Sequence, residues 1–131
     1  MMAQVLVVQD NPVNQRISSL MLRKLGFAVD LANNGEEGVA MWAEGNYDAI
    51  IMDCHMPVLD GYSATARIRE QELAQGRDSN HRLPIIALTA HAMTHDRQKC
   101  LDSGMDDYLT KPVDSSDLGA TLNRWLKRES V

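Results

Sequence analysis

The sequence predicts an α/β protein built on a doubly wound parallel sheet, and two observations lead to this class. Short β-rich runs alternate with helix-like segments five times along the chain. Three of the runs, Val5–Val8, Ala49–Met52 and Ile85–Leu88, are almost continuously apolar, which is typical of strands covered by helices on both faces. Strict alternation of strand and helix favours a parallel sheet between two helical layers.

The remaining elements follow from weaker patterns and from capping signals. Two more strands are expected at Phe27–Leu31 and Asp107–Leu109. Asn11-Pro12 fits the start of the first helix and Gly26 its end. Apolar residues recur between them at helical spacing: Val13, Ile17, Leu20, Met21 and Leu25. The other helices are expected at Glu36–Ala43, Asp60–Leu73, Thr94–Asp102 and Asp114–Lys127.

Composition limits the classes of function. A chain of 131 residues, 44% hydrophobic, has the size of one domain, and we expect a single domain over residues 1–131. The net charge is −5 with no basic stripe, so nucleic acid is not an expected partner. No apolar run reaches the roughly 20 residues that span a membrane, and no signal-peptide pattern is present, so we expect no membrane contact by this domain. Two cysteines, Cys54 and Cys100, fit a reducing cytoplasm.

Polar residues follow four of the five predicted strands: Gln9 and Asp10 after the first, Asp53 after the third, Thr89 after the fourth and Lys111 after the fifth. Open α/β sheets bind ligands at this edge. Strand order 2-1-3-4-5 would place Asp10 beside Asp53. Mg²⁺ takes one or two carboxylates, keeps several waters and reaches phosphate oxygens. The set therefore indicates an acid nucleophile that accepts a phosphoryl group, with a metal ion and Lys111 stabilising charge.

Each of these residues also has an ordinary structural interpretation. An aspartate at a strand end often forms a turn or caps a helix, and a lone lysine is usually a solvated charge. The combination at four strand ends supports the phosphate or Mg²⁺ site, and on the pattern alone both interpretations stay open.

At these residues the chain resembles a response-regulator receiver domain over essentially its whole length. The matching stretches are VLVVQDNPVNQ, MDCHMPVLDGYSATARIR, LPIIALTA and GMDDYLTKPVD. NPVNQ, MDCHMP and IIALTAHAM are most similar to receivers attached to hybrid histidine kinases. The resemblance implies a flavodoxin-like (βα)5 fold of order 2-1-3-4-5. It also implies a cytoplasmic protein or the cytoplasmic part of a membrane-bound hybrid kinase.

The resemblance implies a role for each site residue. Asp53 would be the phosphoacceptor, taking its phosphoryl group from the phosphohistidine of a histidine kinase or histidine phosphotransfer domain. Mg²⁺ (or Mn²⁺) would bind Asp10, Asp53 and the backbone carbonyl of His55. Thr89 and Lys111 would contact the phosphoryl group. Self-phosphorylation and autodephosphorylation would be the only enzymatic activities of the isolated domain.

The resemblance also implies a switch. Tyr108 occupies the aromatic switch position, which turns inward as Thr89 shifts and changes the surface formed by the fourth helix, the fifth strand and the fifth helix. The peptide bond between Lys111 and Pro112 is cis in this family, a bond type largely confined to proline.

Two features are particular to this chain. Gln9 stands where the family usually has an acid that holds Mg²⁺ through water; glutamine keeps the oxygen but removes a charge, so we expect weakened Mg²⁺ binding. His55 and His91 occupy positions that tune phosphoryl lifetime in the family. Histidine titrates near pH 6.5, so the lifetime is hypothesised to vary between about pH 6 and 8. The alternative is that both side chains simply face solvent.

Other functions are less well supported. A pseudo-receiver, which docks partners without phosphorylation, is favoured by Gln9 but not by the intact Asp53, Thr89 and Lys111. A flavin protein would need a phosphate-binding loop in place of QDNPVN, and an aspartate-nucleophile phosphatase would need a second acid two residues after Asp53. His91 and His95 could bind zinc only with a third ligand such as Cys100. Other side chains are expected to pack in the core: Cys54, Trp42, Trp125, Met93 and Met105.

Overall fold

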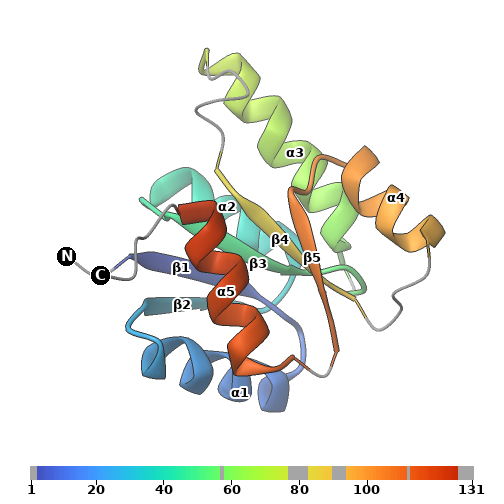
Figure 1. Ribbon diagram of the computed structural model, residues 1–131. Coiled ribbons are helices and arrows are strands. Elements are labelled where there is room, and N and C mark those ends of the chain that lie inside the picture. The colour runs from blue at the N-terminus through green and yellow to red at the C-terminus, as the bar shows by residue number, and fades with distance from the viewer. Residues whose placement is uncertain (1–2, 57, 77–82, 90–93, 112, 127–131) are drawn as a thin grey trace.

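The predicted sheet is present in the computed structural model. The described residues are 3–56, 58–76, 83–89, 94–111 and 113–126, with residues 94–96 described by their backbone alone. The five strands are β1 (Gln4–Val8), β2 (Ala28–Ala32), β3 (Ala49–Asp53), β4 (Ile85–Thr89) and β5 (Asp107–Thr110). All pairs are parallel and the order is β2-β1-β3-β4-β5, which confirms the prediction (Figure 1).

Five helices connect and cover the strands (Figure 1). They are α1 (Pro12–Lys24), α2 (Gly35–Glu44), α3 (Gly61–Ala74), α4 (Thr94–Asp102) and α5 (Ser115–Leu126). Alternate strand residues point to opposite faces, so Leu6 and Met52 pack with α2 and α3. Val7 and Ile51 pack with α1 and α5. This two-sided burial explains why the central strands are apolar throughout.

The end of α1 shows how the sequence sets an element boundary. Asn11 caps the helix by accepting from the backbone N–H groups of Val13 and Asn14. At the other end Gly26 has φ 93°, a left-handed conformation that favours glycine. The Gly26 N–H donates to Arg23 O and the Phe27 N–H to Leu22 O, the two bonds of a Schellman motif. Phe27 therefore belongs to the turn, and β2 begins one residue later than predicted.

Only part of the apolar stripe that identified α1 faces the core. Val13, Ile17 and Leu20 are 65%, 47% and 57% exposed, whereas Leu22 is fully buried. The helix is confirmed, but its anchor is Leu22, with Met21 and Leu25 partly buried beside it. The other packing predictions that fall on described residues hold better: Trp42, Cys54 and Met105 are buried and Trp125 is partly buried.

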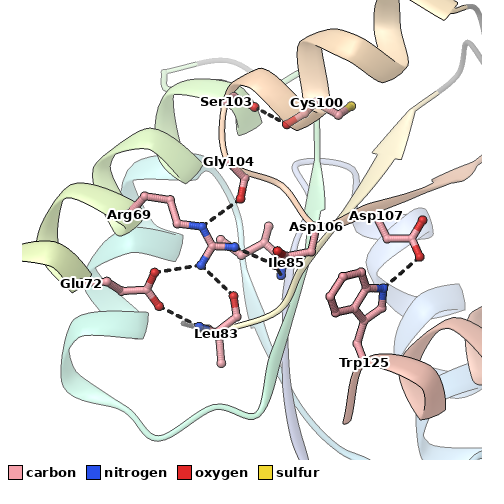
Figure 2. Close-up of polar contacts among 10 residues, drawn as sticks. All are labelled: Arg69, Glu72, Leu83, Ile85, Cys100, Ser103, Gly104, Asp106, Asp107 and Trp125. Atoms are coloured by element: carbon pink, nitrogen blue, oxygen red, sulfur yellow. Dashed lines mark hydrogen bonds and ion pairs between the residues drawn. The ribbon is translucent and has the colours of Figure 1, made fainter. Parts of the chain in front are cut away.

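A charged cluster lies at the amino-terminal ends of β4 and β5 (Figure 2). Arg69 of α3 donates to the Glu72 carboxylate at 2.8 Å and to Asp106 Oδ2 at 2.7 Å. It also donates to the carbonyl oxygens of Leu83 and Gly104. We call Arg69, Glu72 and Asp106 the Arg69 clamp, because they join α3 to the segment before β4 and to the turn before β5. Within the described part of the chain, no helix is long and apolar enough to cross a membrane.

Candidate functional site

The register of the sheet brings the predicted polar residues to one edge. Val8 pairs with Met52, so Asp10 and Asp53 leave neighbouring strands at the same end. Thr89 pairs with Thr110, the residue before Lys111. The structure places Asp53 and Thr89 at the last positions of β3 and β4, rather than just after them.

Asp53 is buried, and two donors hold its carboxyl group. Its side chain is 2% exposed, and its Oδ2 accepts from Lys111 Nζ at 2.7 Å. Its Oδ1 accepts from the His55 N–H at 3.2 Å. The Lys111 side chain is 29% exposed, and the Lys111 N–H donates to Thr89 O. The buried carboxylate is thus paired with a cation that still reaches solvent.

The Asp60-Gly61 pair fixes the helix that follows Asp53. Asp60 caps α3 by accepting from the Ser63 N–H at 2.8 Å. Gly61 donates to Cys54 O, and a Cβ at this position would collide with the backbone carbonyl of Asp53. Glycine is therefore needed here because α3 begins in direct contact with the end of β3.

The connecting loop also holds a backbone strain. Val58 has φ 72° and is 74% exposed. A β-branched residue in the left-handed region is an outlier, and such strain often lies in functional loops. The strained position thus lies between Asp53 and the start of α3.

Gln9 and Asp10 differ in their surroundings although they are adjacent. Gln9 is 3% exposed, and its Oε1 accepts from Ser18 Oγ of α1 at 2.8 Å. Asp10 is exposed. The contact to Ser18 is one that the sequence reasoning missed, and a water-mediated role of Gln9 in metal binding stays a prediction.

The two predicted switch residues lie on neighbouring strands: Thr89 ends β4, and Tyr108 lies in β5. Thr89 is 1% exposed. Tyr108 is half-buried, and the Arg97 guanidinium lies 5.6 Å from its ring centroid, within the range of a cation–π contact. An inward turn of Tyr108 stays a prediction.

The structure describes only one of the histidine side chains for which a role was predicted, that of His55. The His55 side chain is exposed, and its ring meets Tyr62 edge-on at 5.9 Å between centroids. His91, Met93, the peptide bond to Pro112 and the His91–His95 pair lie outside the residues or side chains that the structure describes. Among described residues, no three side chains of His, Cys, Asp or Glu gather as a metal site.

Cys54 follows Asp53 and turns into the core. It is fully buried, and burial raises the pKa of its thiol to about 12. A protonated, buried thiol is a packing group rather than a nucleophile, as the sequence predicted. Its Sγ lies 3.9 Å from that of Cys100 in α4, a proximity that the sequence did not reveal.

The donor set at the edge suits a hard divalent cation. It offers the carboxylates of Asp10, two residues after β1, and of Asp53, the last residue of the neighbouring strand β3. Mg²⁺ requires few protein ligands because it keeps several waters. The two-carboxylate set therefore fits Mg²⁺ better than zinc, which prefers nitrogen and sulfur ligands.

The family of the chain is established by comparison with known proteins. The response regulator receiver domain family matches residues 5–123, and the chain belongs to this family. It is 43% identical over 120 residues to the hybrid signal transduction histidine kinase B of Dictyostelium discoideum, covering 88% of this chain. It is 45% identical over 124 residues to the probable histidine kinase 2 of rice, covering 84% of this chain. The alignments span 6% and 12% of those relatives.

Solved structures agree with this assignment. One is the receiver domain of a sensor histidine kinase from Pseudomonas aeruginosa, with a magnesium ion coordinated in its active site cleft. It has a TM-score of 0.84 and 46% identity, covering 98% of this chain and 100% of the other. Another is the receiver domain of yeast Ssk1, co-crystallised with the histidine phosphotransfer protein Ypd1; its TM-score is 0.90 at 40% identity, covering 99% and 92%. The chain is thus a receiver domain of two-component signalling.

Proposed function

We propose that this receiver accepts a phosphoryl group from a phosphohistidine onto Asp53 in a Mg²⁺-dependent step. The observation that carries the proposal is the state of Asp53. It ends a central strand at 2% exposure, and Lys111 holds it at 2.7 Å. Lys111 also remains open to solvent, so the carboxylate can be approached without losing its counter-charge.

The chemistry follows from these contacts. An Asp53 oxygen attacks the phosphorus, the P–N bond of the donor breaks, and the imidazole nitrogen leaves with the electron pair and takes up a proton. The product is an aspartyl phosphate. Lys111 follows the transferred oxygens, and the Thr89 hydroxyl donates to one of them, because such transition states are stabilised by positioning and charge.

Mg²⁺ would be held by Asp10, Asp53 and the His55 carbonyl. When bound, it offsets the repulsion between the two carboxylates and the incoming phosphoryl oxygens. The magnesium ion in the related Pseudomonas receiver supports this assignment. Gln9 lacks the charge of an acid and its oxygen is engaged by Ser18, so we expect weaker binding than an acid would give.

The exposed apolar face of α1 (Val13, Ile17 and Leu20) is the surface on which the donor would dock. These residues recur at helical spacing, are 47–65% exposed, and lie on the helix that begins two residues after Asp10. Beside them a groove of about 530 Å³ runs between α1 and Ser115 of α5. Because α1 begins close to the edge that carries Asp10 and Asp53, a protein docked on this face could bring its phosphohistidine to Asp53. The yeast complex of a receiver with a histidine phosphotransfer protein supports this class of partner.

Output would pass through the α4, β5 and α5 surface. Tyr108 and Arg97 lie in contact there, beside a hollow of about 550 Å³ that Asp107, Asp117 and Arg124 also line. Movement of Thr89 and Tyr108 would shift the equilibrium between two conformations of this surface. We also propose a cytoplasmic location, since both phosphodonor classes act there.

The decisive experiment is phosphorylation by acetyl phosphate with Mg²⁺, followed by intact-mass analysis. We expect a mass gain of one phosphoryl group that disappears in Asp53→Asn and on chelation of Mg²⁺. Thr89→Ala should accept the group more slowly, because one phosphoryl contact is lost. No gain in the parent protein at millimolar Mg²⁺ would instead support the pseudo-receiver, a docking module without phosphorylation.

Donor docking is tested separately with a phosphorylated histidine phosphotransfer protein. Ile17→Asp should slow transfer from this donor at least tenfold, yet leave labelling by acetyl phosphate unchanged, because the small molecule needs no docking face. Leu73→Asp is the matched control, since Leu73 is 72% exposed but lies at the end of α3. Equal rates for the two variants with the protein donor would exclude α1 as the docking face.

A further inference from the structure

The sulfur atoms of Cys54 and Cys100 lie 3.9 Å apart, and neither cysteine is in a disulfide. Cys54 is 0% and Cys100 1% exposed. They belong to elements far apart in the chain, since Cys54 follows β3 and Cys100 lies in α4. A disulfide needs an S–S distance of about 2 Å, so the two sulfurs must approach by about 2 Å, a displacement within reach of side-chain rotation and a small movement of α4.

Cys100 has a special place in α4. Of the α4 side chains that the structure describes, residues 97–102, Cys100 alone is buried and the others are exposed. Among the α4 side chains that are described, the thiol is thus the one that packs on the core, in the cluster that also contains Tyr62 and Met105. Lys99 adds a contact at the rim, where its Nζ lies 4.4 Å from the Tyr62 ring centroid. Elements with so few buried apolar side chains open locally more readily than the rest of a protein.

The turn after α4 is fixed by side-chain hydrogen bonds. Ser103 Oγ donates to Cys100 O, and Arg69 Nε donates to Gly104 O, both at 2.8 Å (Figure 2). A local opening of α4 would therefore pivot about its carboxyl-terminal end, close to Cys100. The two thiols become accessible to a small oxidant while they stay near one another, which favours a bond within one chain over a bond between chains.

We propose that Cys54 and Cys100 are a modification site, at which hydrogen peroxide produces an intramolecular disulfide that ties α4 to the residue after Asp53. One thiol is oxidised by peroxide to a sulfenic acid with release of water. Once it is accessible to solvent, the second thiol loses its proton and attacks this sulfur as a thiolate. The S–S bond forms, and the hydroxide that leaves takes up the proton as a second water. Overall two thiols and one peroxide give one disulfide and two waters. Thiol reductants reverse the reaction.

The disulfide would restrain the helix that the receiver needs to move. In the reduced protein Cys100 is the one buried side chain among those described in α4. In the oxidised protein α4 would be bonded covalently to Cys54, the residue after Asp53. This consequence for switching rests on the proposed phosphorylation of Asp53, but the formation of the disulfide does not.

The test is peroxide treatment of the folded, full chain at low protein concentration. We expect a monomer whose mass is lower by two hydrogen atoms, a proteolytic peptide pair joining Cys54 to Cys100, and recovery of the original mass with dithiothreitol. Amide hydrogen exchange across residues 94–102 should slow at least tenfold in the oxidised monomer. Oxidised Cys100→Ala and Cys54→Ser should show neither the mass loss nor the slower exchange.

Three results would overturn the proposal. They are a folded protein that gains oxygen atoms without losing hydrogen, a product linked between chains, and a disulfide that leaves exchange in α4 unchanged. These readouts come from the parent protein, so they remain informative if a cysteine variant fails to fold. They also do not require phosphorylation, so failure of the disulfide and failure of Asp53 phosphorylation are distinguished.

Discussion

Each end of the sheet carries an ion-paired cluster: the Arg69 clamp at one end, and Asp53 with Lys111 at the other. The two clusters differ in how many hydrogen bonds their carboxylates accept and in how far their cation is exposed. The Arg69 clamp is closed: Glu72 Oε2 also accepts from the Leu83 N–H and Asp106 Oδ2 from the Ile85 N–H, and the Glu72 and Asp106 side chains are each 3% exposed. At the other end Asp53 has a 29% exposed lysine and a neighbouring strand that leads to exposed Asp10. A saturated cluster can serve structure alone, whereas an open one can take a ligand.

The comparison predicts different responses to loss of the cation. Arg69→Met removes the cation between two buried carboxylates, which keep the N–H donors of Leu83 and Ile85. It also removes the donor to two carbonyl oxygens. The change should lower the free energy of unfolding by about 3–5 kcal/mol, because a buried ion pair is broken. Urea denaturation measures this loss. Because the clamp lies at the opposite end of the sheet from the proposed metal site, added Mg²⁺ should not restore the stability. A loss below about 1 kcal/mol, the range of a surface ion pair, would show that the clamp is not a closed, buried cluster.

Lys111→Met makes the matching change at the open end. Asp53 keeps its bond from the His55 N–H, and water can enter where Lys111 reached solvent, so we expect a smaller loss of about 2 kcal/mol. Millimolar Mg²⁺ should recover most of it, because a divalent cation replaces the missing charge beside Asp53. Urea denaturation with and without Mg²⁺ gives both values. A loss that Mg²⁺ leaves unchanged would contradict the assignment of the metal to this edge.

The cluster at Asp53 and Lys111 could be predicted from the sequence, whereas the Arg69 clamp could not, for physical reasons. Apolar runs mark buried strands, and the strand ends mark the edge where Asp53, Thr89 and Lys111 must meet. The Arg69 clamp joins a helix, a loop and a turn whose spacing in the chain carries no periodic signal. Its geometry arises only when α3 packs beside β4. A charged residue such as Arg69 on a helix is more often solvated, so its type alone gives no warning.

The same limit applies to α1 and to the cysteines. Helical spacing of Val13, Ile17 and Leu20 predicts a helix correctly, but which face is buried depends on how the helix sits on the sheet. Leu22 takes the core position. The contact between Cys54 and Cys100 depends on where α4 lies against the loop after β3, and the sequence separates the two residues by 46 positions.

The smallest effect is expected in the loop of the open cluster. Val58 is in the left-handed region at φ 72°, which costs a β-branched residue about 1–2 kcal/mol, while asparagine tolerates it. The side chain is 74% exposed, so Val58→Asn loses little packing and should raise the free energy of unfolding by about 1 kcal/mol. Val13→Asn is the control, because Val13 is 65% exposed in regular helix and its replacement relieves no strain.

The strained backbone at Val58 and the fully paired Arg69 clamp then serve different purposes at the two ends of the sheet. The loop that follows the proposed phosphoacceptor holds Val58 in a costly conformation, whereas the buried ion pairs of the Arg69 clamp join α3 to the turn before β5. If Val58→Asn and Val13→Asn give the same change in urea denaturation, the loop is not strained. The contrast between the two ends of the sheet would then rest on charge alone.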